Sequence, residues 1–177
     1  MTFAAWCLSL AVSFLLPHTL QAQPTAPGRD AILTASRTII TNARYATFVS
    51  AALATEAPSA RVIDPFAPEA DFTIWFATNP KSRKVQEIQK DGRVTLLYFD
   101  ASSKSYVALK GRATLVRDAS EKATRWKDDW KGMYANQNHG EDYLLVKFVP
   151  DTLEVTSVAL NMNNDPATWK PVTLKLR

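Results

Sequence analysis

The sequence predicts a single domain that is mainly β, with helices flanking an antiparallel sheet. Several runs rich in aromatic and β-branched residues have the length of a strand and end in polar turns. Two of these runs, 93–99 and 106–116, follow each other closely enough to pair as a hairpin. Residues 23–177 suit one domain and supply ample chain to bury a core.

The N-terminus has the pattern of a secretory signal peptide. Residues 1–22 contain no Asp, Glu, Lys or Arg, an apolar run spans Phe3–Leu16, and Leu20-Gln21-Ala22 provides a small-residue cleavage site. The apolar run is shorter than the ~20 residues that a spanning helix needs, so we expect cleavage rather than anchoring. The mature protein would be periplasmic or secreted and free of the membrane. The predicted boundaries are a signal peptide at 1–22, a linker at 23–29 and the domain at 30–177.

The first half of the domain alternates between helix and strand signals. Asp30 is a predicted N-cap for a helix with one apolar face, formed by Ile32, Ala35, Ile39 and Ala43. Tyr45–Leu53 has strand composition, and Asp71–Ala77 predicts a largely buried strand that leads directly into a polar turn. A second helix is predicted from Ser82 to about Asp91.

The middle of the chain predicts a hairpin. Arg93–Phe99 is an apolar strand, Asp100–Lys104 is a polar turn, and Tyr106–Val116 alternates between apolar and polar positions. Gly111 interrupts the second strand. A glycine inside a strand marks a bulge or a close backbone approach, and we favour the bulge over a ligand contact.

The C-terminal part predicts one more helix and the closing strands. Asp118, with Glu121 three residues later, resembles a capping box for a helix that carries Ala119, Ala123, Trp126, Trp130 and Met133 on one face. We expect the two tryptophans to pack against the sheet, with a dimer contact as the alternative. Tyr143–Val149 and Thr152–Val158 are predicted as two strands around a turn at Pro150-Asp151, and Val172–Leu176 as a short last strand.

Three cations surround the start of the second predicted helix, in Lys81-Ser82-Arg83-Lys84. A helix N-terminus is already positive, so each cation there is disfavoured by about 0.3–1 kcal/mol, and an anion would remove the conflict. Glu87 and Asp91 lie toward the other end of the helix, so we do not expect them to relieve it. We interpret Ser82 as N-cap and phosphate ligand, with Arg83 and Lys84 around the same dianion. The alternative is a solvated surface turn.

The order of these segments resembles a known family. The resemblance is carried by Phe76-Ala77-Thr78-Asn79, by Ser82-Arg83-Lys84, by Val94–Phe99, by Tyr106–Gly111 at the expected interval, and upstream by Arg61–Phe66. From about Asp30 to Val158 the chain resembles the pyridoxamine 5′-phosphate oxidase-like, FMN-binding split-barrel superfamily. Within that superfamily it is most similar to the general stress protein branch.

The resemblance implies both a fold and a cofactor. The implied fold is a six-stranded, largely antiparallel split β-barrel that forms a homodimer, with flavin mononucleotide (FMN) in a cleft between the subunits. The residues implied to hold the phosphate are Arg61, Ser82, Arg83 and Lys84. Thr78 is implied to contact the flavin from the preceding strand.

The chain departs from the oxidases of this superfamily at three places. Ala77 stands where they have a tyrosine, and Tyr106 stands where they have a glutamine near the flavin ring. Their C-terminal tryptophan and arginine signature has no counterpart, since Trp169-Lys170-Pro171 is a different motif. We therefore do not expect oxidation of pyridoxamine phosphate, while the phosphate-binding residues are kept.

Other kinds of site find little support in the sequence. The mature chain has no cysteine and one histidine, His139, in a polar loop where we favour solvation over catalysis. One histidine cannot form a two-histidine metal site, so no metal is expected. The net charge of +4 is spread along the chain without a basic helix stripe or a nucleic-acid motif, so we expect no nucleic-acid partner. Redox chemistry would therefore depend on a cofactor.

Three hypotheses remain for the role of this protein: two functions and a loss of function. The first is an exported FMN-dependent oxidoreductase acting on a small molecule, with no catalytic side chain assigned. The second is a non-enzymatic module that binds flavin, haem or another anionic ligand, for example in a stress response. The third is a barrel that has lost its ligand and persists as a dimeric scaffold.

Overall fold

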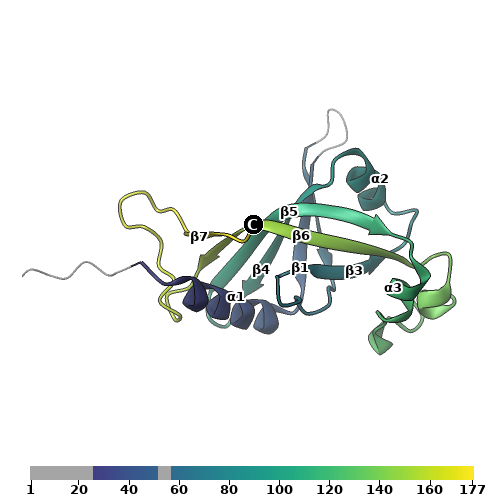
Figure 1. Cartoon of the computed structure of the whole chain (residues 1–177), viewed down its shortest axis with the longest axis horizontal. Helices are drawn as coiled ribbons and strands as arrows, with labels where there is room; N and C mark the ends of the chain where they lie inside the picture. The colour runs from purple at the N-terminus through teal and green to yellow at the C-terminus, as the bar shows by residue number, and fades with distance from the viewer. Residues whose placement is uncertain (1–25, 52–56) are drawn as a thin grey trace, which may run out of the picture.

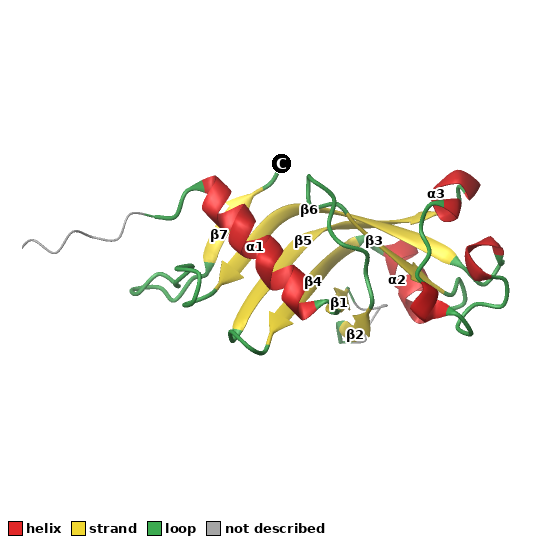
Figure 2. Ribbon diagram, turned by 90° about the horizontal axis from the view of Figure 1, so that it is seen from below, coloured by secondary structure: helices red, strands yellow, loops and turns green. Residues whose placement is uncertain are grey.

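The computed structural model describes residues 26–51 and 57–177. The predicted signal peptide, 1–22, and the linker up to residue 25 lie outside this range, as does the end of the first predicted strand. A curved antiparallel sheet forms the body of the molecule, with α1 lying across β4 and β5 (Figures 1 and 2). The predicted fold class, mainly β with flanking helices, is confirmed.

The sheet has the strand order β2-β1-β4-β5-β6-β3, with β7 paired to β6, and every pairing is antiparallel. This gives seven strands among the described residues instead of the six expected, and the sheet is not closed. The strands are β1 (Ala46–Ser50), β2 (Ser59–Ile63), β3 (Ile74–Thr78), β4 (Arg93–Asp100), β5 (Ser105–Val116), β6 (Leu144–Thr156) and β7 (Val172–Lys175).

Side chains that point to the inner face of the sheet form the main core. Alternate residues of β1, β4 and β5 are fully buried there, among them Phe48, Leu96 and Leu109. Helix α1 (Arg29–Ala43) covers this core with its predicted apolar face, including Ile32, Ala35 and Ile39. The helix begins at Arg29, so the N-cap position belongs to Gly28 and not to Asp30, which lies in the first turn.

Strand β3 begins later than predicted because nearby side chains form a turn, and side-chain contacts also mark the end of β2. Asp71 accepts hydrogen bonds from the amide and hydroxyl of Thr73 at 2.9 Å, and Phe72 has φ 65°, so β3 begins only at Ile74. Strand β2 ends at Ile63 because Asp64 turns away to accept hydrogen bonds from Lys127 and Trp130. Helix α2 (Arg83–Lys90) and β4 lie close to their predicted bounds.

The predicted turn at Pro150-Asp151 is wrong, because β6 runs as one strand from Leu144 to Thr156. Its register against β5 shifts between Lys110 and Gly111, so that Asp151 is an extra residue in the ladder. A Cβ on Gly111 would lie 2.1 Å from the carbonyl oxygen of Val149, so only glycine permits this approach. The predicted bulge at Gly111 is therefore confirmed.

The predicted long helix after Asp118 is also wrong. Asp118 caps it as expected by accepting a hydrogen bond from the Glu121 amide at 2.9 Å, but α3 covers only Ala119–Ala123. Other side chains bind the groups that would continue the helix: Asn138 donates to the carbonyls of Lys122 and Ala123, and Tyr143 donates to that of Arg125. Short 3-10 turns follow at η1 (Asp128–Trp130) and η2 (Gln137–His139), where His139 is exposed.

The segment after α3 forms a second, aromatic core against β3. Trp130 is 5% exposed and packs with Trp75, Tyr143 and Leu145, while Trp126 packs against this group. The expectation that the tryptophans pack is confirmed, whereas Met133 is 69% exposed. In the described part of the chain, no helix has the length and apolar character needed to cross a membrane. The same residues contain no cluster of metal-ligating side chains.

Candidate functional site

The turn between β3 and α2 brings three of the predicted site residues together. The Ser82 amide donates to the Asn79 carbonyl at 2.9 Å, which folds the chain back after Thr78. The hydroxyl oxygens of Thr78 and Ser82 then lie 3.0 Å apart, and the Lys84 ammonium donates to Thr78 Oγ1 at 2.8 Å. Two hydroxyls and an ammonium therefore meet at one point.

The N-terminus of α2 has no side-chain cap. Ser82 occupies the N-cap position with an extended backbone, as predicted, but its hydroxyl bonds Thr78 and accepts no hydrogen bond from the helix. The first turn contains no acidic residue. The positive end of the helix dipole thus lies at Ser82, beside Thr78 and Lys84, which is an arrangement that binds anions.

Lys84 is half-buried at this point. Burial lowers the pKa of its ammonium, and the nearby positive charge of Arg61 lowers it further, while Glu87 acts in the opposite sense. Within the described residues no carboxylate lies close enough to form an ion pair with Lys84. An anion bound beside Lys84 would supply its missing counter-charge.

Arg61 and Arg83, the other two predicted phosphate ligands, lie beside this group and both approach Glu87. Arg61 donates to Glu87 Oε2 and, at 2.7 Å, to the hydroxyl of Ser50, while Arg83 Nε lies 3.2 Å from Glu87 Oε1. The expectation that Glu87 would not relieve the cluster of cations is therefore wrong. One helical turn places Glu87 under Arg83, and the pairing of β2 with β1 brings Arg61 to the same carboxylate.

A cleft of about 300 Å³ adjoins the Thr78, Ser82 and Lys84 group. Its polar end is formed by these side chains with Asn79, and its other walls are mostly apolar. The remaining lining residues are Val62, Ile63, Asp64, Ala77, Trp130, Met133 and Tyr134. Val62 and Met133 are 70% and 69% exposed, so the cleft opens to solvent beside these two residues. Arg61 and Arg83 do not line it.

The aromatic wall of the cleft is held by a partly buried ion pair between Asp64 and Lys127. Asp64 accepts hydrogen bonds from the indole of Trp130 at 2.9 Å and from Lys127 at 2.7 Å. Trp130 meets Phe66 and Tyr134 edge to face, with ring centroids 5.4 and 6.2 Å apart. Sequence reasoning missed this wall because Asp64 and Trp130 are far apart in the chain. The density of aromatic residues between 126 and 134 was the only signal.

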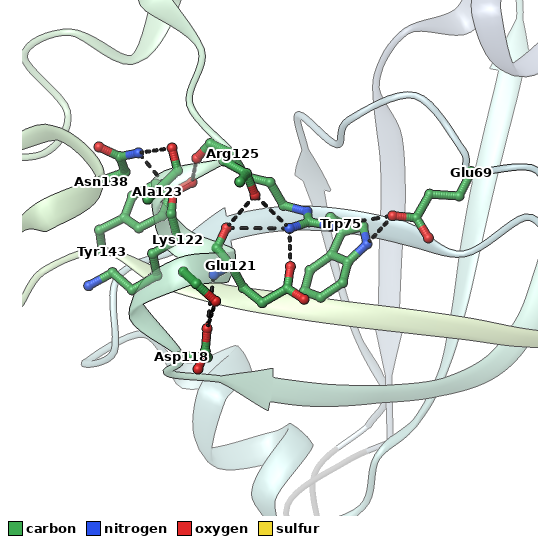
Figure 3. A network of polar contacts seen from close by, with 11 residues as sticks. Glu69, Trp75, Asp118, Glu121, Lys122, Ala123, Arg125, Asn138 and Tyr143 are labelled. Carbon is green, nitrogen blue, oxygen red and sulfur yellow. Dashed lines mark hydrogen bonds and ion pairs between the residues drawn. The ribbon is translucent and has the colours of Figure 1, made fainter.

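A network around Arg125 fixes the loop that carries this wall (Figure 3). The guanidinium of Arg125 stacks over the Trp75 ring at 3.8 Å and forms ion pairs with Glu121 and Glu69. The Trp75 indole donates to Glu69 at 2.8 Å, and Tyr143 donates to the Arg125 carbonyl. The loop after α3 is thereby attached to β3, which is the strand that ends at Thr78.

A larger cavity of about 480 Å³ lies by the bulge of β5 and β6 and has a different character. Two of its cations are already neutralised on the sheet surface, since Arg93 pairs with Asp91 and Lys110 pairs with Glu154. None of the five predicted site residues lines it. The smaller cleft is therefore the candidate functional site.

A sequence profile described as pyridoxamine 5′-phosphate oxidase like matches residues 38–160, which is more than half of the chain. The chain belongs to this pyridoxamine 5′-phosphate oxidase-like family. The match includes both sides of the cleft, from Val62 to Tyr134. A comparison with proteins of curated function gave no match.

Solved structures share the fold. A Clostridium acetobutylicum protein related to general stress protein 26 aligns with a TM-score of 0.68 at 17% identity, over 81% of this chain and 94% of that one. General stress protein 26 of Bacillus anthracis aligns with a TM-score of 0.62 at 21% identity, over 82% and 96%. A pyridoxamine 5′-phosphate oxidase-related, FMN-binding protein of Nostoc punctiforme aligns at 0.52 and 14%, over 87% and 98%. The split-barrel fold expected from the sequence is thus found.

Proposed function

We propose that this protein binds FMN in the cleft between α2 and the aromatic wall. The carrying observation is that Thr78, Ser82 and Lys84 converge at the uncapped N-terminus of α2, at one end of a cleft whose other end is apolar. This donor set suits a phosphate, and the wall of Trp130 and Tyr134 suits a flat ring. The Nostoc punctiforme relative that shares the fold is described as FMN-binding, which supports the same cofactor.

Each part of the site has a separate task in this proposal. Lys84, Ser82 and Thr78 hold the phosphate, with Arg83 and Arg61 adjoining through Glu87. Trp130, fixed by Asp64, orients the ring system and keeps water from one of its sides. Bound FMN would supply hydride transfer to or from a small molecule. The cleft is at the low end of ligand pockets, about 300–1,000 Å³, so a second copy of the chain would complete it in a homodimer.

A binding role without catalysis is the second candidate, and one observation favours it. The titratable side chains of the cleft are already engaged or neutral: Asp64 with Trp130 and Lys127, Lys84 with Thr78. Burial, with a smaller effect of Asp142, raises the pKa of Tyr134 to about 12. Apart from Lys84, which is assigned to the phosphate, no acid or base of the described cleft is therefore available for catalysis, as expected of a module that only holds its ligand. The uncharged segment 1–22 supports export of either form to the periplasm or the medium.

Phosphate-specific binding is the first test. We expect the purified protein to bind FMN, and Lys84→Ala to weaken FMN about tenfold or more, since about 1.4 kcal/mol of lost ion pairing gives a factor of ten. The affinity for riboflavin, which lacks the phosphate, should change less than about twofold in the same variant. Fluorescence titration of both flavins measures this. Lys90→Ala, an exposed lysine on the same helix, is the matched control.

Unchanged FMN affinity in the Lys84 variant, or equal losses for the two flavins, would count against the assigned phosphate site. A protein that binds neither flavin would refute the proposed function. Reduction of bound FMN by nicotinamide donors then separates the two candidates. Turnover supports the oxidoreductase, and stoichiometric binding without turnover supports the binding module.

A further inference from the structure

The carboxylate of Glu87 is the most enclosed charge next to the cleft. It is 1% exposed and lies where α2 meets β1 and β2. Three side chains contact this carboxylate. Ser50 donates a hydrogen bond to Oε2 at 2.5 Å, Arg61 donates to the same oxygen, and Arg83 lies near Oε1. A buried charge is stable only when it is paired and hydrogen-bonded, so this arrangement fixes Glu87 and its partners together.

The two arginines are held differently. Arg61 is 19% exposed and is fixed by Glu87 together with the Ser50 hydroxyl at 2.7 Å and the Ser59 carbonyl at 3.1 Å. Arg83 is 59% exposed, and its Nε lies 3.2 Å from Glu87 Oε1 without forming a hydrogen bond, since that oxygen has no hydrogen-bond partner among the described residues. Arg61 is therefore immobilised, while Arg83 is free to turn toward a ligand.

The charges of this group match a phosphate monoester. Arg61, Arg83 and Lys84 contribute three positive charges and Glu87 contributes one negative charge, which leaves two positive charges. A phosphate monoester carries about −1.5 to −2 charges at pH 7. Glu87 therefore reduces the charge of the cluster to a value that one such group neutralises.

We propose that Glu87 is a positioning residue for the phosphate end of the ligand. It fixes Arg61 and pairs with Arg83 beside the Thr78, Ser82 and Lys84 group, so that Arg61 is held before an anion arrives and Arg83 can turn toward the anion. This role rests on the proposed function, because it concerns the same site. A residue that holds the ligand-binding side chains in place changes the affinity for the ligand without touching it.

The proposal predicts a loss that is specific to phosphate. In Glu87→Gln, Arg61 loses its only ion pair among the described residues. FMN binding should weaken about tenfold, as is typical when a residue that orients a binding side chain is replaced. Riboflavin binding should change less than about twofold. In an Arg61→Met background, the same substitution should have little further effect on FMN, because Glu87 acts mainly through Arg61. Fluorescence titration of the four proteins measures all of these values.

Equal losses for FMN and riboflavin, or a full Glu87→Gln effect in the Arg61→Met background, would overturn the proposal. Equal losses would indicate a general disturbance of the fold, and the second result would show that Glu87 does not act through Arg61. Should Glu87→Gln not fold, Ser50→Ala provides the milder variant, since it removes a hydrogen bond from both Glu87 and Arg61. We expect the same selective loss from it, and an unchanged FMN affinity would count against the role.

Inorganic phosphate distinguishes failure of this proposal from failure of the proposed function. Phosphate should raise the thermal unfolding midpoint of the wild type, and should raise that of Glu87→Gln much less. This result would support the role of Glu87 even if neither flavin bound. If the wild type binds FMN and the two proteins respond alike to phosphate, the role of Glu87 is wrong while the cofactor assignment stands.

Discussion

Lys84 links the candidate site to stability through its protonation. Burial and the charge of Arg61 lower its pKa from the ordinary 10.5, so the folded protein loses this proton at lower pH than the unfolded chain does. Between the two pKa values the unfolded chain binds more protons, and stability therefore rises with pH in that window. The cost of holding a charged lysine there is greatest at lower pH, where no anion compensates it.

We predict that Lys84→Met is more stable than the wild type near neutral pH, and that this advantage shrinks as the pH rises toward 10.5. Urea unfolding across this range measures the difference. Lys90→Met, on the exposed end of the same helix, controls for loss of a positive charge. If the free energies of unfolding of the wild type and Lys84→Met change in parallel with pH, the pKa of Lys84 is not lowered in the folded protein. The hypothesis that Lys84 needs an anion would then be wrong.

The sequence revealed the site residues that are neighbours in the chain, and missed those that tertiary structure brings in. Thr78, Ser82 and Lys84 meet because a single turn folds them together, which local turn chemistry predicts. The place of Glu87 was predicted wrongly, because its pairing with Arg61 depends on the register of β2 against β1. Neither the sequence of β1 nor that of β2 contains a pattern that predicts how the two strands align.

Among the elements, β6 shows how a neighbouring strand overrides a local signal. Pro150 and Asp151 are turn-forming residues, and taken alone they predicted two strands. Gly111 of β5 lies opposite Pro150 of β6 and leaves room for the extra residue. The ladder therefore continues on both sides of the bulge. The other elements that follow from periodicity and polar turns, such as the hairpin of β4 and β5, were predicted closely.

Gly111→Ala tests this packing. The added Cβ would lie 2.1 Å from the Val149 carbonyl oxygen and 2.6 Å from Pro150 Cα, and these are backbone atoms that cannot rotate away. We expect the free energy of unfolding to fall by at least about 1–3 kcal/mol, as for other overpacked sites. Gly28→Ser is the control, since its Cβ meets no atom within 4 Å. Urea unfolding that leaves Gly111→Ala as stable as the control would contradict the bulge geometry.

At the scale of the whole molecule, the outer face of the sheet carries an aromatic row formed by Phe99 of β4 and Tyr106 of β5, which pair with each other. Tyr45 lies in the bend just before β1, the other neighbour of β4. Tyr45 and Phe99 are 48% and 57% exposed. The sequence predicted alternation only for the strand that begins at Tyr106. Alternation alone cannot distinguish a face exposed to water from a face covered by another chain.

We predict that a second copy of the chain covers this row in the homodimer that we propose. Wild-type protein should have twice the mass of the chain in native mass spectrometry, and Phe99→Glu should shift it to the monomer, because a charge would be buried without a partner. Val158→Glu is the matched control, since Val158 is 79% exposed and lies outside the row. A wild-type monomer would refute the dimer. A Phe99→Glu protein that stays dimeric would place the interface elsewhere on the sheet. If Phe99→Glu is monomeric, the presence or absence of the FMN mass reports whether the cleft needs the interface.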